Sequence, residues 1–206
     1  MQNSPDEGYI KFQSTWRQSP PFGMGQIAAL NHWRQKLYNA NLVGAYPDGI
    51  GFGNVSRRAE ANHFYISGSK TGNFKSLDNT HYAKVVDFDI AKNWVACEGP
   101  VIASSESMSH AVIYAQVPEV NAVFHVHHLT LWKKVLYKIP TTVAMAEYGS
   151  PEMANEIIRL IAETDVADQK VFAMAGHQEG LFSFGKTLEE AGSAILDLVA
   201  KNIPGG

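Results

Sequence analysis

The sequence contains a single cysteine, Cys97, so the chain cannot form an internal disulfide bond. It has no apolar stretch that approaches the ~20 residues needed by a membrane-spanning helix. It also lacks any run of Lys or Arg, and its net charge is −3, so nothing indicates binding to nucleic acid or to an anionic membrane. Residues 1–7 are polar and carry no apolar core of a secretory signal. Together these absences predict a cytoplasmic protein.

The composition predicts one globular domain preceded by a short arm. Hydrophobic residues make up 45% of the 206 residues and charged residues 18%, values that allow a sizeable core. Residues 1–22 contain several prolines and show little periodicity, so they predict an N-terminal arm. Residues 23–206 contain no repeat, low-complexity tract or inner linker, and they are predicted to form a single domain.

Helical and strand patterns alternate along this domain. Helical spacing of apolar residues predicts helices at about 26–41, 105–116, 129–137, 151–163 and 188–201. Short apolar runs predict strands near 51–56, 63–67, 84–90, 121–127, 171–175 and 181–183. Because strands and helices interleave, the predicted fold class is α/β.

Two histidines, His125 and His127, end the apolar run of the predicted strand 121–127. Residues i and i+2 of a strand point to the same face, so the two imidazoles would lie together and suit one divalent metal. His177, between Gly176 and Gly180, could add a third ligand, and three histidines with an open position are typical of catalytic zinc. The alternative is a pair of ordinary buried histidines and a separate turn histidine.

Three hydroxyl- or glycine-rich segments could bind an anion. Ser104 and Ser105 precede a predicted helix, whose N-terminus attracts negative charge, and Glu106 would then stand beside both anion and metal. The other two segments are 51–58, with Gly53 and Asn54, and 67–72, with Lys70 as a counter-charge. Neither has the spacing of a dinucleotide fingerprint or a P-loop. The alternative reading is a capped helix and two ordinary loops. His110 could orient the site from the helix that follows Glu106.

In this order and spacing the motifs resemble the class II aldolase/adducin family over about residues 27–200. The resemblance rests on Gly53-Asn54-Val55-Ser56, Ser67-Gly68, Ser104-Ser105-Glu106 with His110 and Tyr114, His125-Val126-His127, and Gly176-His177 with Gly185-Lys186-Thr187-Leu188-Glu189-Glu190-Ala191. It implies a three-layer α/β/α sandwich with a mostly antiparallel central sheet. It also implies a homo-oligomer, often a tetramer.

The resemblance further implies a role for each matching residue. His125, His127 and His177 match the ligands of Zn2+, or of another divalent metal, and Glu106 matches the acid/base residue of the sugar-phosphate aldolases. The positions that match the family's phosphate-binding residues are Gly53, Asn54, Ser67, Gly68, Ser104 and Ser105. The implied function is a zinc-dependent aldolase or related lyase that acts on a phosphorylated sugar or hydroxy-ketone through a metal-stabilised enediolate.

Other activities of the same scaffold remain as alternatives: an epimerase, a dehydratase, a decarboxylase or a non-catalytic adducin-like binding protein. The family's epimerases carry Asp where this chain has Glu106, and adducin-like members lack the three histidines, so both comparisons favour an aldolase-type enzyme. Two departures leave the reaction open. The family's aldolases and epimerases use a C-terminal tyrosine, and this chain has none after Tyr148. Its dehydratases use a further Glu, and Glu147 lies in that region without matching surroundings.

Overall fold

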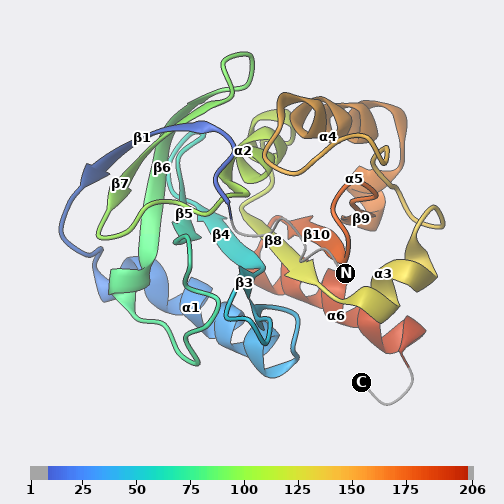
Figure 1. Cartoon of the computed structure of the whole chain (residues 1–206), viewed down its shortest axis with the longest axis horizontal. Helices are drawn as coiled ribbons and strands as arrows, with labels where there is room; N and C mark the ends of the chain where they lie inside the picture. The colour runs from blue at the N-terminus through green and yellow to red at the C-terminus, as the bar shows by residue number, and fades with distance from the viewer. Residues whose placement is uncertain (1–8, 204–206) are drawn as a thin grey trace.

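The structure is a computed structural model that describes residues 9–203. An eight-stranded sheet with the order β1-β7-β6-β5-β4-β8-β10-β9 forms its centre (Figure 1). Its strands are β1 Gln13–Gln18, β4 Asn54–Arg58, β5 Phe64–Ser67, β6 Tyr82–Asp89, β7 Trp94–Gly99, β8 Ala122–His127, β9 Val171–Ala173 and β10 Gly180–Gly185. Only the β1–β7 pair among these neighbours is parallel, so the sheet is mostly antiparallel, as predicted.

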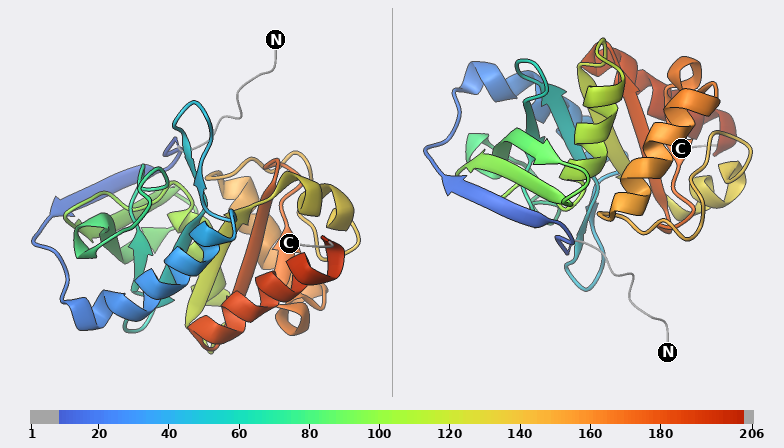
Figure 2. Two further views of the ribbon diagram at one scale, coloured as in Figure 1. Left: turned by 90° about the horizontal axis from the view of Figure 1, so that it is seen from below. Right: turned by 90° about the horizontal axis from the view of Figure 1, so that it is seen from above.

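Helices cover both faces of the sheet, which gives the three predicted layers. One face carries α2 and α4, and the other carries α1 and α6 (Figure 2). The helices are α1 Met24–Asn39, α2 Ser107–Gln116, α3 Leu129–Val135, α4 Pro151–Glu163, α5 Val166–Gln169 and α6 Leu188–Asn202, with a 3-10 turn at Asn79–His81. A separate hairpin joins β2 Gly44–Ala45 to β3 Gly51–Phe52 through a turn at Pro47-Asp48-Gly49. No helix within residues 9–203 is long and apolar enough to cross a membrane.

Strand β8 divides the core between the two faces. Ala122, Phe124 and Val126 pack in the hydrophobic cluster under α1 and α6, whereas Val123 packs in the cluster under α2 and α4. His125 and His127 share the parity of Val123, so both lie on the α2/α4 face. The period-2 prediction for these two histidines is therefore confirmed.

Strands β1 and β7 of the central sheet were absent from the sequence-based prediction. All six residues of β1 are exposed, so no apolar alternation marks it, and its register with β7 is set by backbone pairing. It belongs to the predicted N-terminal arm, whose Phe12 is buried in the core. Strand β7 was missed because its half-buried pattern includes Ala96 and Glu98, which are weak strand formers.

Candidate metal centre

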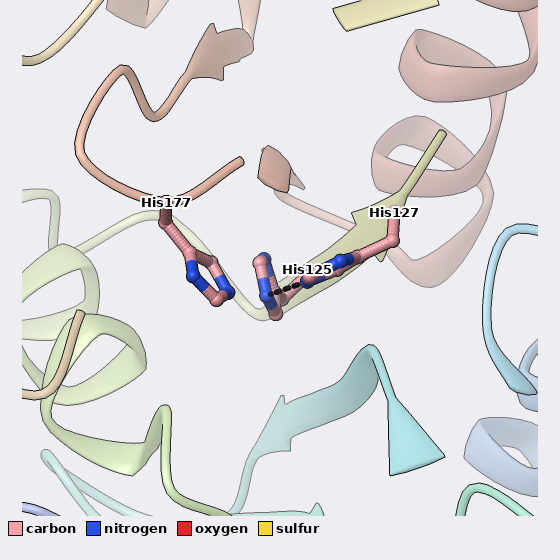
Figure 3. A group of neighbouring side chains, drawn as sticks. All are labelled: His125, His127 and His177. Carbon is pink, nitrogen blue, oxygen red and sulfur yellow. Dashed lines mark hydrogen bonds between the residues drawn. The ribbon is translucent and has the colours of Figure 1, made fainter. Parts of the chain in front are cut away.

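Three buried imidazoles converge on the α2/α4 face of the sheet (Figure 3). His125 and His127 come from β8, and His177 comes from the connection between β9 and β10. The register of β8 with β10 places His125 opposite Phe182 and His127 opposite Gly180, and this brings the His177 turn beside them. One ligand atom of each histidine lies within 4.8 Å of the others, and their exposures are 0%, 2% and 5%.

All three imidazoles are held in the neutral form. Burial, which penalises a charged ring, lowers the pKa of His125 and His127 well below the usual value. Burial is also the main reason that the pKa of His177 falls to about 3. The neutral imidazole keeps a lone pair on one nitrogen, and that is the form that binds a metal ion.

Glu106 lies beside His177, with Oε1 of the carboxyl 3.7 Å from Nε2 of the imidazole. It is the N-cap residue of α2 and is buried, and its Oε2 accepts a hydrogen bond from Ser109 Oγ at 3.0 Å. Oε1 accepts no hydrogen bond from the part of the chain that the structure describes. Burial raises the pKa of Glu106 to about 7, opposed by the Ser109 hydrogen bond and by the charge of Lys11.

The donor set fits a divalent cation. Nε2 of His125 and Nε2 of His127 lie 3.0 Å apart, and two nitrogen ligands of a tetrahedral zinc ion lie about 3.3 Å apart. Nδ1 of His125 points to the carbonyl oxygen of Leu181 at 3.2 Å, which leaves Nε2 for the ion. Three neutral imidazoles beside a buried carboxyl with an unsatisfied oxygen are a costly arrangement without a cation. These residues therefore fit a metal site with an open position.

The buried Glu106 should make the stability of the metal-free protein depend on pH. A carboxyl pKa of about 7, raised from 4.5, means that the folded state holds the proton more tightly than the unfolded chain. Stability is therefore lost as the pH rises from about 4.5 through 7, by about 3 kcal/mol in total. Glu106→Gln removes this loss of stability. The three histidines contribute the same pH dependence to the stability of the wild type and of the variant.

We expect metal-free Glu106→Gln to be more stable than the wild type at about pH 8 and equally stable below about pH 4.5. Urea unfolding in the presence of a chelator measures the difference at each pH. Equal stability of the two proteins at about pH 8 would show that the Glu106 carboxyl titrates normally.

A polar hollow lies next to this cluster. Its lining includes five of the six predicted phosphate-binding residues: Gly53, Asn54, Gly68, Ser104 and Ser105, together with Gly51, Ser69, Lys70, Thr71 and Gly72. An isolated antiparallel bridge between Gly68 and Ala103 brings the two hydroxyl-rich segments together. Ser67 does not line the hollow, because its Oγ accepts a hydrogen bond from the backbone N–H of Val55 at 3.1 Å.

Two glycines that line this hollow pack so closely against their neighbours that no side chain fits. A Cβ at Gly53, where φ is +73°, would lie 2.7 Å from Val43 Cγ1 and 3.0 Å from the carbonyl oxygen of His125. A Cβ at Gly68 would lie 2.4 Å from Val101 Cγ2. Side chains at either position would force β4 away from β8 or the 67–72 loop away from Val101.

A buried hydrogen-bond network holds Asn54 toward the hollow. His110 Nε2 lies 2.6 Å from Asn54 Oδ1, and His110 Nδ1 lies 2.6 Å from Ser56 Oγ, which lies 2.8 Å from Tyr114 Oη. Burial lowers the pKa of His110, so its ring is neutral and donates from Nε2 to Asn54 while Nδ1 accepts from Ser56. The amide N–H groups of Asn54 are then left to face the hollow. His110 was predicted to orient the site, and the residue that it contacts there is Asn54.

Sequence reasoning missed three side chains around the histidines. The ring of Tyr148 packs 4.6 Å from that of His177, with Lys11 Nζ 4.2 Å above the centre of Tyr148. Tyr46 Oη lies 3.0 Å from His127 Nδ1. All three residues come from loops or from the N-terminal segment, where no periodicity marks a functional side chain. His128, in contrast, caps α3 by accepting a hydrogen bond from the backbone N–H of Leu131.

Comparison with known proteins gives a family and a fold. Residues 45–200 match the family described as the class II aldolase and adducin N-terminal domain. Similar solved structures include L-fuculose-1-phosphate aldolase from Thermus thermophilus (19% identity, TM-score 0.60, covering 84% of this chain and 88% of that one). YgbL from Escherichia coli is also similar (17% identity, TM-score 0.64, covering 87% of this chain and 88% of that one). So is a sugar-phosphate aldolase from Thermotoga maritima (16% identity, TM-score 0.61, covering 84% of this chain and 90% of that one). No curated protein sequence matches the chain.

Proposed function

The chain belongs to the class II aldolase and adducin N-terminal domain family, and we propose that it is a zinc-dependent lyase that cleaves a phosphorylated sugar or hydroxy-ketone. The observation that carries the proposal is the buried cluster of His125, His127 and His177 beside Glu106, with a polar hollow next to it. Burying neutral imidazoles beside an unsatisfied carboxyl oxygen costs free energy, and binding a partner does not require this arrangement.

Each group of the site has a task in this reaction. A divalent ion held by the three histidines would polarise the substrate carbonyl as a Lewis acid. Glu106 lies beside His177, and we assign it the proton exchange with the substrate. In the cleavage direction the Glu106 carboxylate would take the proton of the substrate hydroxyl whose carbon becomes the aldehyde. The C–C bond then breaks, the aldehyde leaves, and Glu106 returns the proton to the carbon that has lost its bond.

The hollow would hold the phosphate group of the substrate. Ser104 and Ser105 precede the N-terminus of α2, where the helix dipole favours an anion. Asn54 offers amide N–H groups, and Lys70 is the cation among the residues that line the hollow. Anchoring the phosphate there would place the reacting carbons beside Glu106.

Lys70→Met should weaken the binding of the phosphate group about tenfold, because one charge-assisted hydrogen bond is lost. Turnover at saturating substrate should stay unchanged, since Lys70 is neither one of the three metal-binding histidines nor the acid/base residue. Titration of inorganic phosphate into the zinc-loaded protein measures the first effect, and kcat and KM measure the second. Lys75→Met is the matched control, because this exposed lysine follows in the same loop and does not line the hollow.

Product analysis tests the proposed reaction. The zinc-loaded protein is incubated with a panel of ketose phosphates, and an aldehyde and a shorter ketose phosphate are the expected products. An epimer, a dehydrated product or carbon dioxide would assign one of the alternative activities of the scaffold. Inactivity together with an absence of bound metal would favour the non-catalytic binding protein.

We also propose a homo-oligomer, consistent with the large apolar side chains that the connection between α3 and α4 exposes. Tyr137 is 68% exposed, Val143 48% and Met145 90%. Large exposed apolar side chains mark contact surfaces where they form a contiguous patch.

A further inference from the structure

On the Nδ1 side of its ring, His127 contacts a tyrosine that is in turn hydrogen-bonded to a glutamate. Tyr46 Oη lies 3.0 Å from His127 Nδ1, and it donates a hydrogen bond to Glu179 Oε2 at 3.1 Å. The three residues come from separate segments: the end of β8, the β2–β3 hairpin and the turn before β10. The sequence analysis assigned no role to Tyr46 or to Glu179.

The direction of these hydrogen bonds follows from the position of the cation site. Nε2 of His127 faces Nε2 of His125, where the ion would sit, so Nδ1 carries the proton. Nδ1–H then donates to Tyr46 Oη, and the Tyr46 hydroxyl donates to the Glu179 carboxylate. These two hydrogen bonds fix both the tautomer and the ring orientation of His127. For His125 the backbone carbonyl of Leu181 has the same task.

The position of Tyr46 is set by its hairpin. Its backbone N–H donates to the carbonyl of Ile50 at 2.9 Å, and its carbonyl accepts from Gly49 at 2.9 Å. Its ring packs against Phe52 with a centroid distance of 4.7 Å. The hydroxyl is therefore presented to His127 by a hairpin whose backbone and ring packing hold it in place.

The backbone at Glu179 supports a role for its side chain. Glu179 has a φ of +71°, in the left-handed region that glycine adopts more easily than any other residue. Its carbonyl accepts a hydrogen bond from the backbone N–H of His128 at 3.1 Å, which ties the turn to the end of β8. The backbone alone therefore favours glycine at this position, and what the glutamate adds is its hydrogen bond to Tyr46.

From this geometry we propose that Tyr46 and Glu179 are positioning residues that raise the affinity of the His125–His127–His177 site for its divalent cation. The inference rests on the proposed metal site and goes beyond it by naming residues that touch neither metal nor substrate. It predicts that metal affinity depends on a hydroxyl and a carboxylate on the far side of a ligand. Because the backbone at Glu179 is strained, replacing it with glycine removes the carboxylate without destabilising the fold. A role in metal binding can therefore be distinguished from a purely structural role.

The test measures zinc affinity, by competition with a chromophoric chelator, and the Tm of the metal-free protein. Tyr46→Phe and Glu179→Gly should each bind zinc about 10–100-fold more weakly than the wild type. Metal-free Glu179→Gly should be as stable as the wild type or more so, because glycine relieves the left-handed backbone. A loss of affinity without a loss of stability is the result that a merely structural role cannot give.

Two control variants match these changes away from the cluster. Ala61→Gly relieves a left-handed residue, with a φ of +48°, in the turn between β4 and β5. Tyr82→Phe removes a buried hydroxyl that donates to Asn31 Oδ1 at 2.8 Å. Both controls should bind zinc as the wild type does.

The outcomes separate the inference from the proposed function. Zinc binding by the wild type with unchanged affinity in both Tyr46→Phe and Glu179→Gly would overturn the inference and leave the metal site standing. Weaker binding that the control variants share would also overturn it, as a general effect of substitution. A wild-type protein that takes up no zinc would instead overturn the proposed function itself.

Discussion

Glu106→Gln is expected to lower turnover at least about 10²-fold while the protein keeps its fold and its bound metal. Glutamine has the same shape as glutamate and can still accept the hydrogen bond from Ser109, but it cannot exchange a proton with substrate. The expected loss therefore falls on kcat, with little change in KM. Steady-state kinetics on the substrate found by product analysis, together with the zinc content of the same sample, give the result.

Glu147→Gln is the matched control for this experiment. The side chain of Glu147 is 72% exposed and pairs with Lys11 at 3.2 Å, on the outside of the site. Its replacement should leave turnover close to that of the wild type. If Glu147→Gln lost turnover and Glu106→Gln kept it, Glu147 would be the acid/base residue, as in the dehydratase alternative.

Removal of a single histidine ligand is the second large effect that we expect. In His125→Ala or His177→Ala the remaining two imidazoles cannot close the coordination shell, so zinc binding and turnover should both disappear. Zinc at 100 times its Kd should stabilise the wild type by about 2.7 kcal/mol, which raises Tm by about 5–10 °C for a chain of this size. Neither variant should show this shift.

Thermal unfolding with and without zinc measures the effect, and His63→Ala is its control. His63 is only partly buried and lies 3.3 Å from Glu60 in the turn between β4 and β5, away from the cluster. Its variant should keep the full zinc-dependent rise in Tm. An equal rise in His125→Ala and the wild type would place the zinc somewhere else on the protein.

Elements with a strong local pattern were predictable from the sequence. The helix predicted at about 151–163 is α4, where Pro151 begins the helix and Ser150 caps it by accepting from the backbone N–H of Met153. The face of β8 that carries His125 and His127 followed from strand periodicity alone. Strand β1 could not be predicted, since its six residues are exposed and its place at the edge depends on backbone pairing with β7.

Some residues of the site were likewise predictable from local sequence, and others depend on tertiary structure. The His125–His127 pair came from local spacing. The turn at His177 and the helix start at Glu106 made these residues candidates to join it, and the family resemblance supported them. Their meeting depends on the antiparallel pairing of β8 with β10 and on the start of α2, which are tertiary features. Ser67 shows the limit of the resemblance, because its hydroxyl is used inside the sheet by Val55.

The central claim is that His125, His127 and His177 hold a divalent cation, and metal content tests it most directly. Elemental analysis is made on protein purified without a histidine tag, beside His125→Ala and His177→Ala. We predict about one zinc, or another divalent ion, per wild-type chain and none in either variant. A wild-type chain that carries no metal and takes up none from added zinc would contradict the account.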